Sequence, residues 1–165
     1  EIRLSLVGSE MCIRDSFVYS LTEDAAAGTD SSHNSISLPD FSMRLLHICS
    51  ILPSDAVYEE PPASAAIRLS PDERFLYVST RFAEVITVFK IDHGCLAQIQ
   101  QTGCGGIHPR DIVLTPDGRY LLVANRTRGG LVSFQINQET GRLMDICSRV
   151  PAPEAVSIVL SQHTI

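Results

Sequence analysis

The sequence predicts an all-β chain built from repeated units of four antiparallel strands. The first observation is a repeat: Ser70–Arg81 recurs as Thr115–Arg126, 45 residues further along the chain. The second is that each unit divides into four short runs rich in Val, Ile, Leu, Phe and Tyr, separated by turns that contain Pro, Asp and Gly. Such runs between such turns are typical of strands. Four strands in about 45 residues, repeated, are typical of a β-propeller blade.

A second repeat indicates that part of another blade precedes these two. Arg44–Ser50 and Arg142–Ser148 agree at five of seven positions, and Cys95–Ile99 is a weaker copy that lies between them. Because the last copy closes a four-strand unit, we interpret all three segments as the outermost strands of successive blades.

The two complete blades are predicted at 63–101 and 109–150. In the first blade, the strands from innermost to outermost (a to d) are 63–70, 74–80, 84–91 and 95–101. In the second blade, they are 109–115, 119–125, 130–137 and 142–150. Between strands a and b of the second blade, Pro116 presets φ for a turn and Gly118 tolerates the positive φ that closes it.

Parts of two further blades are expected on either side. The earlier blade covers about 17–52, with Phe17–Ser20 as strand b, Ser35–Leu38 as strand c and 44–52 as strand d. After the second complete blade, 153–160 is expected to form the first strand of another blade. The fold expected for 17–165 is therefore a partial β-propeller, with two complete four-stranded antiparallel blades and parts of the flanking ones.

Composition narrows the possible partners. The formal net charge is −6, with 13 basic and 19 acidic residues, so the chain lacks the basic footprint of a nucleic-acid-binding protein. No apolar run approaches the ~20 residues that cross a bilayer, so we expect no membrane partner. The five cysteines are odd in number and scattered, which favours reduced thiols and a cytoplasmic location.

No motif in the chain calls for a metal or a cofactor. The five histidines show no metal-ligand spacing. Gly103–Gly106 lacks the Lys-Ser/Thr of a phosphate-binding loop and is better interpreted as a connection between blades. We therefore expect neither a metal site nor a cofactor.

Several motifs in a fixed order resemble those of the lactonase-type seven-bladed propeller family. These motifs are Leu69–Asp72, Phe75–Arg81, Pro109–Ile112, Thr115–Asn125 and Val150–Val156. The resemblance covers about 63–160 well and 17–52 weakly. It implies the C-terminal part of one propeller that lacks its N-terminal blades. It also implies hydrolysis of 6-phosphogluconolactone, or a related sugar lactone, in carbohydrate metabolism and without a cofactor. A piece with two uncovered blade faces is expected to be inactive alone.

The resemblance also selects candidate site residues. Opening a lactone needs an activated water, a donor to the developing oxyanion and cations for a phosphate. Arg81 and His108 are the candidate catalytic residues, and Arg110 and Asp111 are the candidate substrate-binding residues. Two plainer interpretations remain open: Arg81 as a solvated loop residue, and an Arg110–Asp111 ion pair beside a solvated His108.

The chain departs from the family pattern in two places, and the second departure favours an alternative, a non-catalytic propeller that serves as a protein-binding scaffold. Phe82 follows Arg81 where the family has Gly. Ser20-Leu21 stands where the family is expected to have Asn-Glu, so a site carboxylate is missing. Separately, 1–16 fits no blade and resembles translated adapter sequence, so we expect it to be a non-native leader.

Overall fold

The computed structural model of the chain describes residues 3–7, 15–23, 41–52, 57–93 and 95–161. These residues form strands and no helix, so the described part contains no helix that could cross a membrane. The strands are β1 (Arg3–Val7), β2 (Asp15–Glu23), β3 (Phe41–Ser50), β4 (Ala63–Leu69), β5 (Phe75–Arg81), β6 (Val85–Asp92), β7 (Cys95–Gly103), β8 (Ile107–Leu114), β9 (Tyr120–Arg128), β10 (Gly130–Ile136) and β11 (Leu143–Val150).

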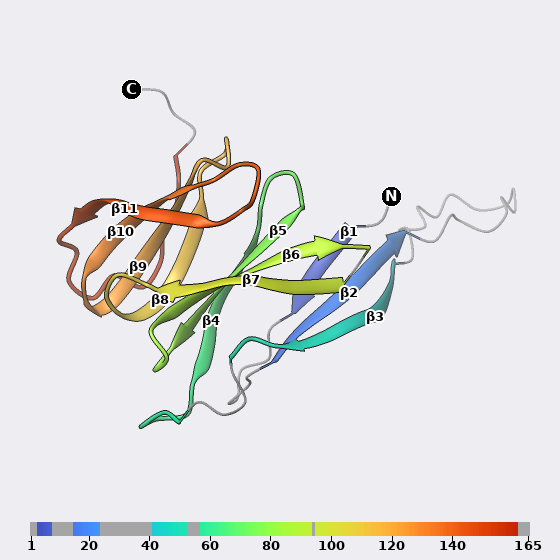
Figure 1. Cartoon of the computed structure of the whole chain (residues 1–165), viewed down its shortest axis with the longest axis horizontal. Helices are drawn as coiled ribbons and strands as arrows, with labels where there is room; N and C mark the ends of the chain where they lie inside the picture. Colours follow the sequence, from blue (N-terminus) through green and yellow to red (C-terminus); the bar gives the residue numbers. More distant parts are fainter. Residues whose placement is uncertain (1–2, 8–14, 24–40, 53–56, 94, 162–165) are drawn as a thin grey trace, which may run out of the picture.

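The two predicted complete blades are confirmed. Strands β4-β5-β6-β7 form one antiparallel sheet in chain order, and β8-β9-β10-β11 form the next (Figure 1). Their bounds lie within three residues of the predicted ones, and the largest difference is at β9. This strand continues to Arg128 because Arg128 pairs with Ile107, which also starts β8 earlier than expected.

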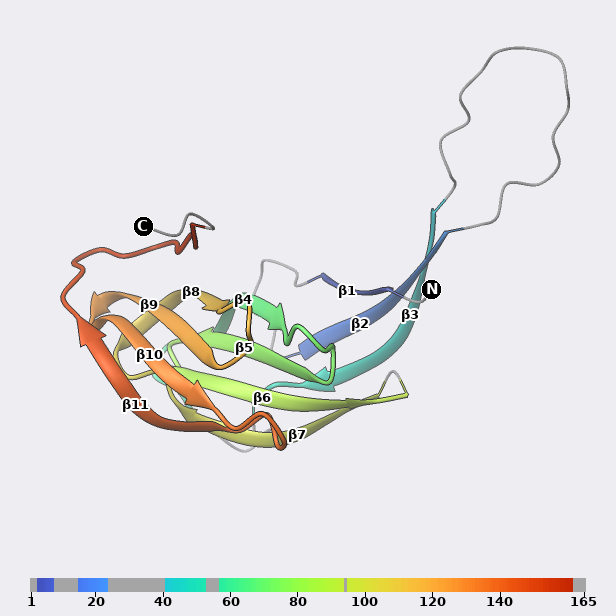
Figure 2. The same cartoon turned by 90° about the horizontal axis from the view of Figure 1, so that it is seen from above.

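The innermost strands of the two blades lie side by side. Strand β8 contacts both β4 and β5, and Figure 2 shows β4 and β8 together on one side of the molecule with β7 and β11 on the other. Each chain segment therefore runs from the inside of a blade to its outside and then returns to the inside of the next blade. This winding is that of a β-propeller.

The third sheet corrects the strand assignment of the earlier blade. Its order is β1-β2-β3, and β2 pairs with β3 along its whole length, from Asp15↔Ser50 to Glu23↔Phe41. Strand β3 precedes β4 as β7 precedes β8, so β3 is a strand d and its neighbour β2 takes the place of a strand c. The prediction that Phe17–Ser20 is a strand b is therefore wrong. The predicted strand at 35–38 lies outside the described residues.

Two terminal segments also differ from expectation. Arg3–Val7, which we expected to lie outside the blades, forms β1 and pairs with β2. The non-native origin of 1–16 stays a prediction. At the other end, 153–160 is not a strand. A strand needs a hydrogen-bonded neighbour, and none of the described strands pairs with this segment.

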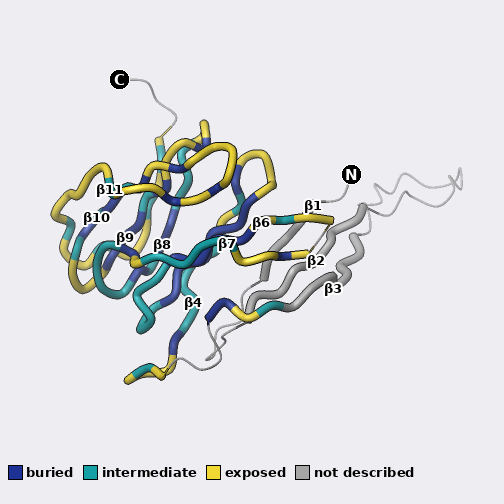
Figure 3. The backbone as a smooth tube through the Cα atoms, in the orientation of Figure 1, coloured by how far each residue is buried: buried dark blue, intermediate teal, exposed yellow. Residues whose placement is uncertain are grey.

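The core lies between the sheets. Along β5, Phe75 and Tyr77 pack toward the second blade, whereas Leu76 and Val78 pack toward the end of β3 with Ile51. Both faces of β5 are thus covered, and Figure 3 shows it dark blue, in contrast to the largely exposed β11. Blade-on-blade burial is what holds the sheets together.

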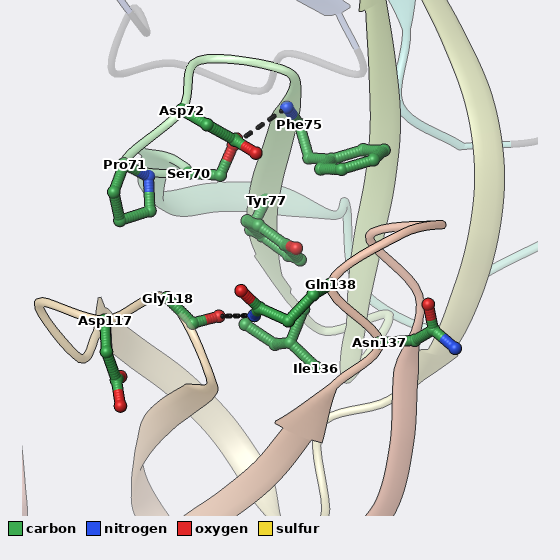
Figure 4. A pocket seen from close by; sticks show the side chains of 10 residues that line it. All are labelled: Ser70, Pro71, Asp72, Phe75, Tyr77, Asp117, Gly118, Ile136, Asn137 and Gln138. Atoms are coloured by element: carbon green, nitrogen blue, oxygen red, sulfur yellow. Dashed lines mark hydrogen bonds between the residues drawn. The ribbon is translucent and has the colours of Figure 1, made fainter.

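A hydrogen bond crosses the core at the end of the blades where strands a turn into strands b. The buried hydroxyl of Tyr77 donates to the carbonyl oxygen of Gly141 at 2.8 Å, beside the turns that contain Pro71 and Gly118 (Figure 4). In the same pocket, Gln138 Nε2 donates to the carbonyl oxygen of Gly118 at 2.7 Å. These two bonds join strand β5 of the first blade and the a–b turn of the second blade to the c–d turn of the second blade.

We predict that Tyr77→Phe lowers the free energy of unfolding of the intact protein by about 1–2 kcal/mol, because the buried Gly141 carbonyl loses its donor. Urea denaturation measures this change. The matched control is Tyr120→Phe, at an exposed tyrosine, which should leave the urea midpoint unchanged. Equal midpoints for both variants would contradict the prediction.

Candidate active site at the junction of two blades

The candidate catalytic residues lie at a junction between the two blades, at the end of strand b in the first blade and the start of strand a in the second. Arg81 is the last residue of β5, and His108 is the second residue of β8. Strands β5 and β8 are in contact, so the turn after β5 and the start of β8 lie at the same end of the blades. The pocket of Figure 4 lies at the opposite end, where β5 begins.

Irregular pairing directs the side chains of β8. The register with β9 shifts on both sides of Pro109, from Ile107↔Arg128 to Pro109↔Asn125 and then to Asp111↔Ala124. His108 and Arg110 stand at these two irregularities. Such bulges re-aim side chains and are frequent next to active sites.

His108 has an unusual backbone and an unpartnered ring nitrogen. Its φ is 65°, in the left-handed region that favours glycine. Its backbone N–H donates to Glu84 Oε2 at 2.5 Å, and its ring stacks edge-to-face on Phe82 with centroids 5.4 Å apart. Nε2 is buried and has no hydrogen-bond partner among the described residues. A buried polar atom without a partner is a place where a ligand or water is expected.

Two arginines face this histidine without a carboxylate of their own. Arg81 Nε is buried and has no hydrogen-bond partner among the described residues. Burial and the nearby charge of Arg110 lower the pKa of Arg81, although a guanidinium stays protonated in proteins. Neither arginine forms an ion pair within the described part of the chain. Two adjacent unpaired guanidinium groups favour the binding of an anion.

The same surroundings keep His108 neutral. Burial lowers the pKa of His108, and the positive charges of Arg81, Arg110 and Arg126 lower it further, whereas Glu84 opposes them. A neutral imidazole at neutral pH can take a proton from water. The arrangement therefore combines a general base with cations beside it.

Asp111 is occupied by structural contacts. Its Oδ1 accepts from Arg68 Nη2 and from the Ile112 N–H, both at 2.9 Å, and its Oδ2 accepts from the Ile158 N–H at 2.9 Å and from Ser157 Oγ at 3.4 Å. The open alternative of an Arg110–Asp111 ion pair is not observed, because Asp111 pairs with Arg68. A substrate contact of Asp111 stays a prediction, while its visible contacts join β8 to β4 and to the segment after β11.

Other polar atoms without partners lie at the same end of the blades. Buried side-chain oxygens and nitrogens that lack a hydrogen-bond partner in the described residues are Ser64 Oγ, Thr80 Oγ1, Arg81 Nε, His108 Nε2 and Asn125 Oδ1. Ser64 is paired with Thr80 in the β4–β5 register, and Asn125 with Pro109 in the β8–β9 register. This end of the two inner strands is thus rich in unused hydrogen-bonding groups.

Sequence reasoning missed Glu84, which contacts His108 directly. The signal was present in the repeat: Glu84 aligns with Gly129, 45 residues further on, so a charged residue stands where the other blade has a glycine. Both positions have positive φ, 57° for Glu84 and 103° for Gly129. By contrast, Arg126, the repeat counterpart of Arg81, pairs with Glu154 Oε2 at 2.9 Å.

Among the residues that the structure describes, no group of three or more His, Cys, Asp or Glu could hold a metal ion. The features of the junction are therefore an imidazole, two unpaired guanidinium groups and one carboxylate. The family model described as a lactonase with a 7-bladed β-propeller matches residues 16–160. The chain belongs to this lactonase family.

Relatives of known name agree with this assignment. The chain is 33% identical over 117 residues to a 6-phosphogluconolactonase of Bacillus subtilis, which covers 70% of this chain and 33% of that protein. It is 39% identical over 87 residues to a 6-phosphogluconolactonase of Formosa agariphila, which covers 50% of this chain and 25% of that protein.

A solved structure of a Lactobacillus plantarum protein superposes with a TM-score of 0.73 at 28% identity, over 93% of this chain and 40% of that one. The chain thus spans a third or less of the length of these two curated lactonases. The architecture of this lactonase-family chain is that of part of a propeller.

The contacts of Asp111 lead to a prediction on stability. Asp111→Ala removes the acceptor of the Ile112 N–H, the Ile158 N–H and Arg68 Nη2, so the intact protein should lose about 2–3 kcal/mol of unfolding free energy. Urea denaturation checks this value. Asp145→Ala, at an exposed strand position, should change stability by less than about 0.5 kcal/mol. Wild-type stability of the Asp111 variant would show that these contacts contribute little.

Proposed function

We propose that the intact protein containing this chain hydrolyses a sugar lactone, either 6-phosphogluconolactone or a closely related one. The observation that carries the proposal is the junction of Arg81, His108 and Arg110. Arg81 Nε and His108 Nε2 are buried there without a hydrogen-bond partner among the described residues, and the charge of Arg110 acts on both groups. Relatives in the same family that are named 6-phosphogluconolactonase support the choice of substrate class.

In the proposed reaction, neutral His108 takes a proton from a water molecule as the water oxygen attacks the lactone carbonyl carbon. The guanidinium of Arg81 donates to the carbonyl oxygen as it becomes an oxyanion. The oxyanion then collapses, the ring C–O bond breaks, and the proton held by His108 passes to the departing alkoxide. The product is an open-chain hydroxy acid. Arg110 binds the phosphate or the new carboxylate. Water is the only co-reactant.

The alternative of a non-catalytic scaffold loses its main support. It rested on Ser20-Leu21 standing at the end of a strand b, where the family has a carboxylate. Strand β2, which contains these residues, takes the place of a strand c, so Ser20-Leu21 does not follow a strand b. The departure at Phe82 remains, and its ring packs against His108.

We further propose that this chain is the C-terminal part of its propeller and is inactive without the missing N-terminal blades. Its coverage of a third or less of the two curated lactonases supports this proposal. A cytoplasmic location is also proposed, on the odd number and scattered positions of the cysteines.

Arg81→Ala in the intact protein should lower kcat for lactone hydrolysis by about 100- to 1000-fold, the usual cost of removing an oxyanion donor. Steady-state hydrolysis of 6-phosphogluconolactone and of gluconolactone measures the effect. The matched control is Arg142→Ala, at an exposed arginine near the opposite end of the blades, which should keep wild-type activity. Undiminished activity of the Arg81 variant would rule out its role, and an inactive wild-type protein would rule out the enzyme.

Arg110→Gln should shift the acid limb of the kcat/KM profile to higher pH. Arg110 disfavours the imidazolium, so its removal raises the pKa of His108 toward its ordinary value and leaves less neutral base at acid pH. The loss of activity should be greater near pH 6 than near pH 8, as about 6.5 is the ordinary histidine pKa. Arg142→Gln, at an exposed arginine near the opposite end, should leave the limb in place. A profile that does not move would exclude His108 as the titrating base.

A further inference from the structure

The carboxylate of Glu84 joins the turn of one blade to the first strand of the next. Oε2 accepts the His108 N–H at 2.5 Å, and Oε1 accepts the Phe82 N–H at 3.2 Å. The carbonyl oxygen of Glu84 also accepts the N–H of Cys104, which lies between β7 and β8, at 2.8 Å. Glu84, in the β5–β6 turn, therefore binds both the connection that leads into β8, through Cys104, and His108 in β8 itself.

Glu84 and the two residues whose N–H groups its carboxylate accepts all have left-handed backbones. The φ values are 67° for Phe82, 57° for Glu84 and 65° for His108. Residues with a Cβ avoid this region, and several such residues in one place persist only where the surroundings enforce them. Here the enforcing contacts are the two hydrogen bonds to the Glu84 carboxylate.

The second blade shows that the turn itself does not need a glutamate. Gly129 occupies the counterpart of Glu84 and adopts positive φ without a steric penalty. A second pair behaves in the same way at the other end of the blades, where Glu73 has φ 58° and its counterpart Gly118 has φ 68°. Glu73 lies away from His108, so it provides a reference for the backbone effect alone.

We propose that Glu84 is a positioning residue of the junction: its carboxylate holds His108 in the left-handed bulge that places the imidazole within the influence of the Arg81 and Arg110 charges. This inference rests on the proposed function for its catalytic meaning. Glu84 also supplies the negative charge that faces His108, while Arg81 from the same blade, Arg110 from β8 and Arg126 from β9 supply the positive charges.

The first test uses Glu84→Gly in the intact protein. Glycine relieves the left-handed strain at this position, which offsets part of the loss of the two accepted hydrogen bonds, so the variant should remain folded. The displaced imidazole should lower kcat for lactone hydrolysis by about 10- to 100-fold, with KM changed by less than about threefold. Glu73→Gly makes the same substitution in the same backbone conformation at the remote end and should keep wild-type activity.

The second test uses Glu84→Gln, which keeps the length of the side chain. The amide oxygen of Gln can accept from only one of the Phe82 and His108 N–H groups. The other N–H group then faces the amide NH2, which is also a donor and cannot accept from it. Loss of the carboxylate charge should lower the pKa of His108, measured by NMR titration of the imidazole protons, and shift the acid limb of kcat/KM to lower pH. This shift is opposite in sign to that expected for Arg110→Gln. Glu73→Gly should change neither the pKa of His108 nor the acid limb.

The outcomes separate the two proposals. A wild-type protein that opens no lactone would refute the proposed function, while the His108 titration would still decide whether Glu84 acts on this ring. An active wild type with unchanged kcat and unchanged His108 titration in both Glu84 variants would overturn the positioning role and leave the function standing. Should Glu84→Gly unfold, the strain argument would be wrong and Glu84→Gln would decide the role.

Discussion

The structure depends on the burial of each blade face against its neighbour. Strand β5 has no exposed face of its own, because Tyr77 packs toward the second blade and Val78 toward the end of β3. This packing sets the distance between the blades. It therefore brings Arg81 of one sheet near His108 of the next. The candidate site is therefore a property of a blade pair, and a single blade would contain only half of it.

The junction combines this packing with an unusual distribution of charge. The chain as a whole is acidic, yet Arg81 and Arg110 lie next to each other without carboxylate partners in the described residues, whereas Arg68, Arg74 and Arg126 have one. Leaving two partly buried cations unpaired is costly unless an anion completes the site. Both carboxylate oxygens of Glu84 accept hydrogen bonds from backbone N–H groups, and neither pairs with these cations.

Sequence reasoning predicted the parts of the chain that repeat and failed where the repeat is absent. The copies at Ser70 and Thr115 located eight strands, since alternation and turn residues recur in both. Strand β2 has no clear copy, so its rank in the blade could not be assigned from its residues. Arg81, His108 and Arg110 were identified through family motifs, but Glu84 was missed. The role of Glu84 depends on its left-handed φ, and in a sequence only a glycine indicates that a position has such a φ.

The order of strands has one further consequence. Among the described strands, β4 and β8 each have a neighbour on one side only, so the amide and carbonyl groups of their other edge are not used in these sheets. These edges lie on the inner side of the blades, and their polarity comes from the main chain, whatever side chains the strands carry. The axis of such a ring is therefore lined with hydrogen-bonding groups before any functional residue is added. Changes in side chains therefore leave this polar wall in place.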